Sequence, residues 1–325
     1  MLNAAIYGLG RWGGRLIDSV KDSPKIRLVK GVTRNPAAHR DLAAKTGLEL
    51  VESYADVLRD PRIDAVVLAT PHSLHHEQIV QAARAGKHIY TEKPMTLTRK
   101  SAEQTIDAVN AAGVTLSVGF NRRHAPAFLE MARRVRAGDI GKVLHMEAQQ
   151  SGPTVFKYKR GMWRNSRAEA PGGGMAARGI HTLDAMIQIG GLVRSVFAYS
   201  DSRAAPPESE IDDTTSMLLR FDSGVTGYLG TIFATAELWR VHVFGSNGWI
   251  EMRSHEELNV CALEGTPEKI TLPARDIERA ALEAFADGVA AGQRFVVPAE
   301  QAVNGVAVLE AIVASAESGQ PVQIA

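Results

Sequence analysis

Lys93 is the residue of this sequence whose type and position best suit proton chemistry. It lies in the triplet Glu92-Lys93-Pro94, directly after a short stretch, residues 88–90, that is typical of a strand. Pro94 has a restricted φ and favours an extended conformation for the residue before it, which constrains the direction of the Lys93 ammonium. A lysine held in this way can polarise a carbonyl or hydroxyl oxygen and transfer a proton to it.

A second strand is predicted just upstream of this triplet. Residues 65–69 form an apolar run with β-branched members, which indicates a buried parallel strand, and the run ends at Thr70-Pro71. A helix is predicted over residues 77–85. Both strands therefore present polar residues at their carboxyl ends, where open α/β sheets bind their ligands.

The glycines near the start of the chain predict a dinucleotide site. Gly8, Gly10 and Gly13 follow a predicted strand over residues 4–7 and precede a predicted helix over residues 14–20. In this context the first glycine allows a tight turn, the second lets the backbone approach a pyrophosphate, and the third allows close helix packing. A glycine-rich turn without a ligand is the alternative, but the strands and helices that follow favour nucleotide binding.

The end of the next predicted strand, residues 27–32, bears on the choice of cofactor. An NAD enzyme usually has an acidic residue here that binds the ribose 2′-hydroxyl, whereas this chain has Thr33 and Arg34 and no acid before Asp41. A guanidinium can pair with a 2′-phosphate. The sequence therefore predicts NADP(H) as the preferred cofactor, with NAD(H) possible. Arg34 as a solvated loop cation is the alternative.

The remaining pattern predicts two domains. Residues 1–119 are expected to form a Rossmann domain with a doubly wound parallel sheet. Residues 120–325 are expected to form an α+β domain whose open, mostly antiparallel sheet has helices on one face, with hairpin turns at 222–224, 246–248 and 264–265. For the C-terminal helix, packing back on the first domain is an alternative to packing on the second. Residues 175–189 are expected to be helical and residues 151–174 to be a long loop.

These motifs resemble those of the glucose–fructose oxidoreductase, inositol dehydrogenase and rhizopine-catabolism (Gfo/Idh/MocA) family. The similarity covers nearly the whole chain and is most specific in Glu92-Lys93-Pro94. The other matching segments are residues 8–13, 69–71 with His75, 85–88, 119–123, 172–184 and 309–312.

The resemblance implies a nicotinamide ring near the Glu-Lys-Pro loop and a substrate held against the sheet of the second domain. It also implies a catalytic set of one lysine with an Asp and a His four residues apart. Lys93 and His181 match this set, but the Asp position is Ala177. His181 could then work with Lys93 or with Asp184, or Lys93 alone could supply the proton.

The expected site residues fall into three groups. The catalytic residues are Lys93 and His181, and no metal is expected although His72, His75 and His76 lie close together in sequence. The cofactor-binding residues are Gly8, Gly10, Arg11, Trp12, Gly13, Thr33, Arg34, Thr70, Pro71, His75, Glu92 and Lys93. The substrate residues are Tyr158, Trp163, Arg164, Arg178 and Asp184, although for Arg178 a solvated helix face is the favoured alternative.

Composition narrows the class of partner. Lys and Arg total 37 and Asp and Glu total 36, so no basic excess points to nucleic acid or to an anionic membrane. The single cysteine, Cys261, fits a reducing compartment, and no signal peptide or membrane span is expected, which predicts a cytoplasmic protein. The resemblance implies a homodimer or homotetramer formed through the outer face of the open sheet.

These observations predict an oxidoreductase that transfers hydride between the nicotinamide and a sugar, a polyol or another cyclic hydroxyl or carbonyl compound. One alternative is an enzyme with a tightly bound cofactor that catalyses elimination or hydration through transient oxidation. Another is a nucleotide sensor without catalytic activity, since the same fold can serve as a binding module. Retention of Lys93 and His181 argues against the sensor.

Overall fold

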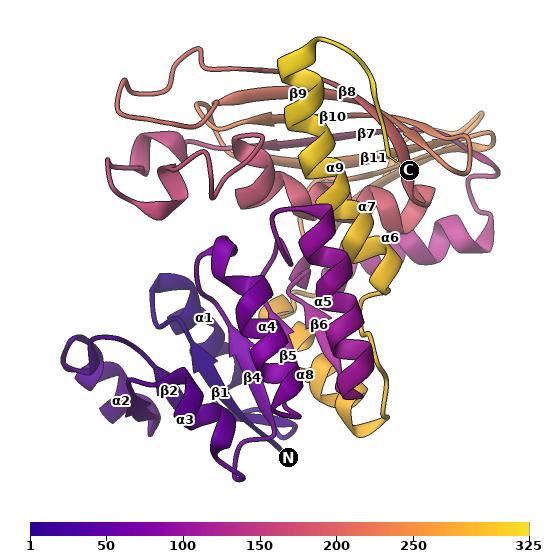
Figure 1. Cartoon of the computed structure of the whole chain (residues 1–325). Helices are drawn as coiled ribbons and strands as arrows, with labels where there is room; N and C mark the ends of the chain where they lie inside the picture. Colours follow the sequence, from indigo (N-terminus) through magenta and orange to yellow (C-terminus); the bar gives the residue numbers. More distant parts are fainter. Residues whose placement is uncertain (325) are drawn as a thin grey trace. The chain divides into compact units, whose positions relative to one another are not determined.

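In the computed structural model of the chain, residues 1–324 are described, and they form two compact units (Figure 1). The first unit contains Met1–Thr96, Lys100–Asn121 and Asp276–Ala302, and the second contains the remaining described residues. The sequence predicted a boundary near Gly119. The difference is the return of Asp276–Ala302 to the first unit, because helix α8 (Ile277–Ala290) buries Leu282 and Phe285 in the core of that unit.

The sheet of the first unit has six strands in the order β3-β2-β1-β4-β5-β6, and its strand pairs are parallel. The strands are β1 (Leu2–Tyr7), β2 (Ile26–Val32), β3 (Glu49–Val51), β4 (Ala65–Leu68), β5 (His88–Thr91) and β6 (Leu116–Val118). The chain fills the sheet in one direction from β1 to β3 and in the other direction from β4 to β6, so the strand order reverses between β1 and β4. In such sheets the ligand binds at this point, at the carboxyl ends of the strands. The predicted Rossmann fold is confirmed.

Helices cover both faces of this sheet, as the alternation of strands and helices predicted (Figure 1). They are α1 (Arg11–Val20), α2 (Arg40–Thr46), α3 (Tyr54–Arg59), α4 (His75–Arg84), α5 (Arg99–Ala112) and α8, with 3₁₀ turns η1 (Pro36–His39), η2 (His72–Leu74) and η3 (Asn121–His124). In α1 the residues Leu16, Ile17 and Val20 recur at helical spacing and lie in the same core cluster as Phe285 of α8.

The sheet of the second unit has nine strands in the order β14-β13-β12-β11-β7-β10-β9-β8-β15. They are β7 (Val143–Ser151), β8 (Val193–Asp201), β9 (Thr214–Phe221), β10 (Thr226–Ile232), β11 (Leu238–Gly245), β12 (Gly248–Met252), β13 (Glu257–Ala262), β14 (Glu268–Thr271) and β15 (Val322–Gln323). The β7–β10 pair is parallel and the other pairs are antiparallel. The three predicted hairpins connect β9 to β10, β11 to β12, and β13 to β14.

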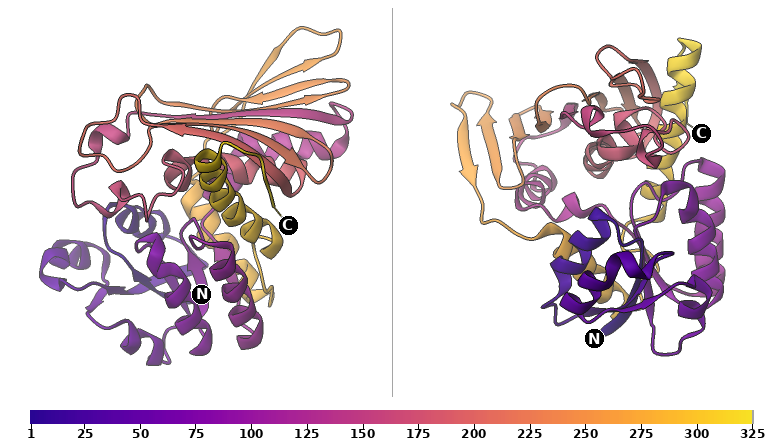
Figure 2. Two further views of the ribbon diagram at one scale, coloured as in Figure 1. Left: turned by 45° about the horizontal axis from the view of Figure 1, so that its top comes forward. Right: turned by 90° about the vertical axis from the view of Figure 1, so that its left-hand side faces the viewer.

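Helices α6 (Pro126–Ala137), α7 (Ile180–Gly190) and α9 (Ala299–Ser318) cover one face of this sheet (Figure 2). The buried side chains of β7, such as Met146 and Ala148, alternate with His145 and Glu147, which are only partly buried. Asn304 and Ser315 of α9 bind the backbone of β8, since the Ser315 Oγ accepts from the Ala198 N–H at 2.9 Å. The predicted mostly antiparallel sheet with helices on one face is confirmed.

The segment between β7 and α7 is irregular, as expected, apart from the short 3₁₀ turns η4 (Val155–Lys157) and η5 (Trp163–Asn165). A π-helical segment, η6 (Met175–Gly179), then leads directly into α7. Single π turns of this kind are frequent at functional sites. Throughout residues 1–324 the helices are too short or too polar to cross a bilayer.

Candidate active site

The glycine loop after β1 has the geometry that a dinucleotide needs. Gly8 has φ 105°, and a Cβ added there would lie 2.4 Å from the carbonyl oxygen of Ala69, so the turn closes against the end of β4. A Cβ on Gly13 would lie 1.9 Å from the Gly8 carbonyl oxygen, whereas one on Gly10 would meet none of the described atoms within 4 Å. The first and third glycines are therefore required by packing, and the second faces open space that a pyrophosphate can fill.

The amino end of α1 completes this loop. Its first residue is Arg11, which is exposed, and within the described chain α1 has neither a side-chain cap nor an acidic residue in its first turn. The first backbone N–H groups of a helix have no intrahelical partner, and the helix dipole favours an anion there. The residues present thus fit the diphosphate of a nicotinamide dinucleotide.

The end of β2 presents a cation. Arg34 is exposed and forms no ion pair within residues 1–324, and the hydroxyl of the buried Thr33 accepts a hydrogen bond from the Asn35 N–H at 3.2 Å. The first acid that follows, Asp41, lies in the first turn of α2. The position at which an acidic residue would bind a ribose 2′-hydroxyl is therefore occupied by neutral and basic side chains.

His75 connects the loops that follow β4 and β5. Its ring is fully buried, with Nδ1 2.9 Å from the carbonyl oxygen of Pro94 and Nε2 3.1 Å from that of Thr70. The Thr70 hydroxyl donates to the Gln78 side chain at 2.7 Å, and Pro71 precedes η2. His75 therefore holds the loop after β4 against the loop after β5. Among residues 1–324, no group of His, Cys, Asp and Glu side chains is arranged to hold a metal ion.

Lys93 lies directly after β5 and is partly buried, and the Lys93–Pro94 peptide bond is cis. The neighbouring Glu92 is 6% exposed. Burial raises the pKa of the Glu92 carboxyl to about 7, although the Lys93 ammonium and the Trp12 indole favour the charged form and lower it.

Two residues near Glu92 were not predicted from the sequence. The carboxylate of Glu278, in the first turn of α8, accepts from Asn121 Nδ2 at 3.0 Å and from Arg15 Nη2 at 2.7 Å. Both Asn121 and Glu278 are buried, and the Glu278 charge acts to raise the pKa of Glu92. No local pattern relates Glu278 to Glu92, because only the packing of α8 on the first unit brings them together.

His181 and Asp184 lie on α7 in the second unit and are 7% and 4% exposed. Both carboxylate oxygens of Asp184 accept from Arg123, at 2.6 and 2.9 Å. Burial raises the pKa of Asp184, and the guanidinium opposes this rise. The pair joins α7 to the segment that precedes α6, so a direct substrate contact by Asp184 requires this ion pair to open.

The residues before His181 lack a carboxylate, as the sequence showed. Ala177 lies in η6 and packs against the buried cluster around Phe233. Arg178 donates to both oxygens of Glu237, at 2.9 and 2.7 Å, and this contact lowers the pKa of Glu237. Like Asp184, Arg178 is engaged in a bidentate pair, which suits a structural role for both.

The three aromatic and basic candidates of the long loop occupy different environments. Tyr158 is 8% exposed and belongs to the apolar cluster of Val155 and Phe233, so its ring is a packing element. The Arg164 guanidinium lies over the Trp163 ring, 4.0 Å from its centre, and both side chains are partly exposed. Trp163 and Arg164 can therefore present a ring face and a cation to a ligand.

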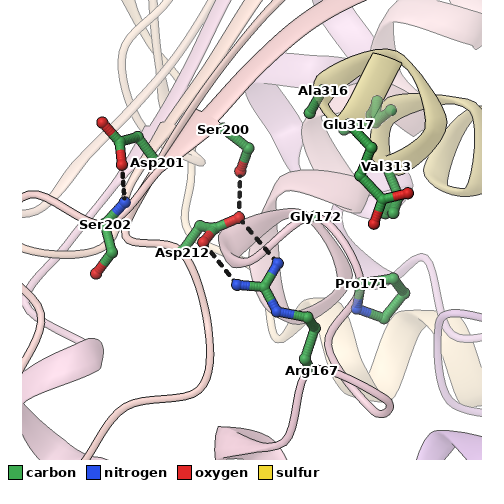
Figure 3. Close-up of a pocket in the computed structure, with 11 residues that line it drawn as sticks. Arg167, Pro171, Gly172, Ser200, Asp201, Ser202, Asp212, Val313, Ala316 and Glu317 are labelled. Atoms are coloured by element: carbon green, nitrogen blue, oxygen red, sulfur yellow. Dashed lines mark hydrogen bonds and ion pairs between the residues drawn. The ribbon is translucent and has the colours of Figure 1, made fainter. Parts of the chain in front are cut away.

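A separate cavity of about 370 Å³ lies beside the carboxyl end of α9 in the second unit (Figure 3). Arg167 points toward Asp212 and pairs with it at 2.9 Å, and the Ser200 hydroxyl donates to the same carboxylate at 2.8 Å (Figure 3). These polar groups satisfy one another and none of the sequence-predicted site residues lines this cavity. We therefore do not assign it to the reaction.

The first unit has the features of an NAD-binding oxidoreductase domain: the strand order, the open glycine loop and a lysine at the carboxyl end of β5. Residues 2–120 match the oxidoreductase family with an NAD-binding Rossmann fold, and residues 128–251 match the GFO/IDH/MocA C-terminal domain. The chain belongs to the GFO/IDH/MocA family of oxidoreductases, which confirms the resemblance drawn from its motifs. It is an NAD(P)-dependent oxidoreductase.

Named relatives act on sugars and polyols. The chain is 30% identical to scyllo-inositol 2-dehydrogenase (NAD(+)) of Bacillus subtilis (strain 168), over 99% of this chain and 96% of the relative. It is 28% identical to 1,5-anhydro-D-fructose reductase of Ensifer adhaerens, over 84% of each chain. The crystal structure of aldose-aldose oxidoreductase from Caulobacter crescentus, complexed with glycerol, has a TM-score of 0.90, 27% identity and 99% coverage of both chains.

Proposed function

We propose that this protein transfers hydride between a nicotinamide dinucleotide and a carbon that carries a hydroxyl or carbonyl group in a sugar or polyol. The observation that carries this proposal is Lys93 at the carboxyl end of β5, on the same sheet as an open glycine loop at the end of β1. The named relatives, which act on inositols, anhydrosugars and aldoses, support the substrate class.

The bound nicotinamide would supply or accept the hydride, and the residues of the chain would handle the proton. In the direction of reduction, the Lys93 ammonium donates a hydrogen bond to the carbonyl oxygen and then its proton to the developing alkoxide. In oxidation, the neutral amine accepts the hydroxyl proton. We assign Lys93 this role, and we assign His181 an assisting role as a second donor or acceptor.

The exposed Arg34 supports a preference for NADP(H). A guanidinium at the end of β2 can form charge-assisted hydrogen bonds with a 2′-phosphate, and the acidic residue typical of NAD enzymes is replaced by Thr33 and Arg34. NAD(H) remains a usable cofactor in this proposal, because the scyllo-inositol relative is named for NAD(+). The cofactor residues proposed from the sequence are retained, with Gly10 and Arg11 at the diphosphate.

Among the substrate candidates, Trp163 and Arg164 are the ones whose side chains have exposed surface and form a stacked pair. Ring faces suit the apolar faces of sugars and cyclitols, and a guanidinium suits their hydroxyl and carboxylate groups. Tyr158 is engaged in apolar packing, and Arg178 and Asp184 are engaged in ion pairs, so we assign these three residues a structural role.

We also propose that the protein is a cytoplasmic homo-oligomer. The face of the second sheet away from α6, α7 and α9 carries Phe197, Tyr199 and Leu218, and the last two are 67% and 58% exposed. An exposed apolar patch on a sheet is typical of a protein interface. A single cysteine in the chain fits a reducing compartment.

Substitution of Lys93 by Met tests the proposed function. A panel of inositols, aldoses and anhydrosugars is first assayed for absorbance change with NADP(H) and NAD(H). With the best substrate, Lys93→Met is expected to lower kcat/KM by at least about 100-fold, the usual contribution of a general acid or base. NADPH affinity, from fluorescence titration, is expected to change by less than about threefold.

Lys93→Arg serves as the matched control, because it keeps a cation but does not release a proton at neutral pH. It is expected to be nearly as inactive as Lys93→Met. Full activity in either variant would overturn the assignment of Lys93. Product formation without a stoichiometric change in NADPH would instead support elimination or hydration with a bound cofactor.

A further inference from the structure

A cluster of buried polar side chains lies next to Lys93 in the first unit, and its members have no part in proton transfer as described so far. Its members come from four segments that are far apart in the chain. They are Trp12 of α1, Tyr90 of β5, Glu92, Asn121 of η3 and Glu278 of α8. Tyr90, Glu92, Asn121 and Glu278 are each less than 9% exposed.

The Glu92 carboxyl and the Tyr90 hydroxyl converge on the backbone of Gly119. A Cβ on Gly119 would lie 2.8 Å from Glu92 Oε1 and 3.1 Å from Tyr90 Oη. A side chain at this position would therefore displace the Glu92 carboxyl. Gly119 allows Glu92 to lie against the end of β6 instead of extending toward solvent.

Two buried polar atoms of the cluster, Tyr90 Oη and Asn121 Oδ1, have no hydrogen-bond partner among the described residues. The Trp12 indole acts on the Glu92 carboxyl. An unsatisfied buried donor or acceptor costs about 1–3 kcal/mol, so such atoms are normally met by ordered water. A hydroxyl and an amide oxygen beside a buried carboxyl are suitable partners for such a water.

The cluster reaches solvent through Glu278 and Arg15. Glu278 binds Asn121 on one oxygen and Arg15 on the other, and the Arg15 side chain is 46% exposed. Arg15 also contacts Asp276 at 3.2 Å at the surface. Hydrogen bonds thus run from Asn121 through Glu278 to the solvated end of Arg15, and the Glu278 charge acts on the Glu92 carboxyl.

We propose that Glu92 exchanges protons with Lys93 and that Asn121, Glu278 and water held among them connect Glu92 to solvent. This inference rests on the proposed role of Lys93 in proton transfer. Glu92 acts through Lys93 and does not contact the substrate, so it is a positioning residue with a relay function.

The steps balance without any change in oxidation state. During reduction, an N–H bond of Lys93 breaks as its proton passes to the substrate oxygen. The O–H bond of the Glu92 carboxyl then breaks and a new N–H bond forms on Lys93. The Glu92 carboxylate recovers a proton from the water of the cluster, which is resupplied through the Glu278 side. Oxidation uses the same steps in reverse.

The charges that face Glu92 support this role. The Lys93 ammonium favours the carboxylate, whereas Glu278 disfavours it, and burial is the largest influence. The resulting pKa of about 7 lets the carboxyl give up and accept a proton at neutral pH. Burial keeps the pKa of Tyr90 well above its ordinary value, so its hydroxyl stays neutral.

Glu92→Gln in the full-length enzyme is the main test, because glutamine has the same shape and no exchangeable acid. We expect kcat to fall by about 10- to 100-fold while KM for the sugar or polyol changes by less than about threefold. The limb of the wild-type kcat profile near pH 7 is expected to disappear. In the protein without cofactor, the infrared band of a protonated carboxyl that is lost as the pH rises through about 7 is expected to be absent.

Glu278→Gln provides a second test that does not depend on how well Glu92→Gln folds. Removal of the Glu278 charge lowers the pKa of Glu92, so both the pH limb and the infrared transition are expected to move to lower pH. Glu283→Gln on the same helix is the control, since Glu283 binds Ser23 and Arg279 and lies outside the cluster. It is expected to behave as the wild type.

The outcomes separate this inference from the proposed function. If Lys93→Met is inactive while Glu92→Gln keeps the wild-type kcat and pH profile, the relay is wrong and the role of Lys93 stands. An infrared transition that is unchanged in Glu92→Gln also overturns the relay. If Lys93→Met is fully active, both proposals fail.

Discussion

At the scale of single residues, the proton chemistry that we propose concentrates on Glu92 and Lys93. The position expected to carry the family aspartate is Ala177, so the imidazole of His181 has no carboxylate one turn away in that direction. In our proposal the buried carboxyl of Glu92 is a further proton source for Lys93. Desolvation is the largest influence on Glu92 and raises the pKa of its carboxyl to about 7.

Arg34 provides a residue-scale prediction about cofactor choice. Arg34→Glu is expected to weaken NADPH binding by about 10- to 100-fold, because a charge-assisted hydrogen bond contributes about 1.5–3 kcal/mol. NADH binding is expected to be unchanged or stronger, since a carboxylate can accept from the ribose 2′-hydroxyl. Fluorescence titrations with both nucleotides measure this change.

Arg27→Glu is the matched control, because Arg27 is an exposed arginine near the other end of β2. It is expected to leave both affinities unchanged. Equal weakening of NADPH and NADH by Arg34→Glu would mean that Arg34 does not contact a 2′-phosphate.

At the scale of elements, the strand–loop–helix unit at the start of the chain shows that two neighbouring glycines can differ in the space that is available for a side chain. Gly13 and Gly14 are adjacent residues of α1, yet a Cβ on Gly13 would overlap the Gly8 carbonyl and one on Gly14 would meet none of the described atoms within 4 Å. The tight packing of Gly13 brings the helix onto the loop and leaves Gly10 facing open space.

We therefore expect opposite effects from two alanine substitutions in α1. Gly13→Ala is expected to destabilise the protein by about 2 kcal/mol or more and to weaken NADPH binding, because the backbone must shift. Gly14→Ala is expected to stabilise it by about 0.5–1 kcal/mol, the usual gain of alanine over glycine in a helix. Thermal unfolding followed by circular dichroism distinguishes them, and equal effects would contradict the packing argument.

At the scale of the whole molecule, the helix-free face of the second sheet is the surface that we expect to form an interface between copies of this chain. Phe197 of β8 and Leu218 of β9 are cross-strand partners, and the rings of Phe197 and Tyr199 are 4.9 Å apart. Nine strands with helices on one face leave a broad surface on the other (Figure 2). A stable interface needs about 800 Å² from each partner, which such a surface can supply.

The double substitution Tyr199→Glu and Leu218→Glu tests this assembly. Charges placed on an apolar interface are costly to bury, so the mass in sedimentation experiments is expected to fall toward that of a single chain. Leu263→Glu, in the turn that follows β13, is the control, since this leucine is 74% exposed outside the patch. An unchanged mass in the double variant would place the interface elsewhere.

The local elements of this fold could be predicted from the sequence because they depend on interactions between residues that are close together in the chain. The glycine spacing after β1, the apolar runs of β4 and β5 and the Asn247-Gly248 turn each specify the conformation of a few neighbouring residues. The helix predicted over residues 175–189 likewise corresponds to α7. The π-helical start of α7 was not predicted, since its apolar pattern is the same as that of an ordinary helix.

By itself, then, the sequence determined the Rossmann class, the glycine loop, the position of Lys93 after a strand and the family. Only the tertiary structure decided that α8 belongs to the first unit, that Glu278 joins Asn121 and Arg15 behind Glu92, and that Asp184 and Arg178 are occupied by Arg123 and Glu237. These pairings link residues far apart in the chain. Their formation depends on which buried surfaces pack together, and periodicity reveals that a helix has an apolar face without revealing its partner.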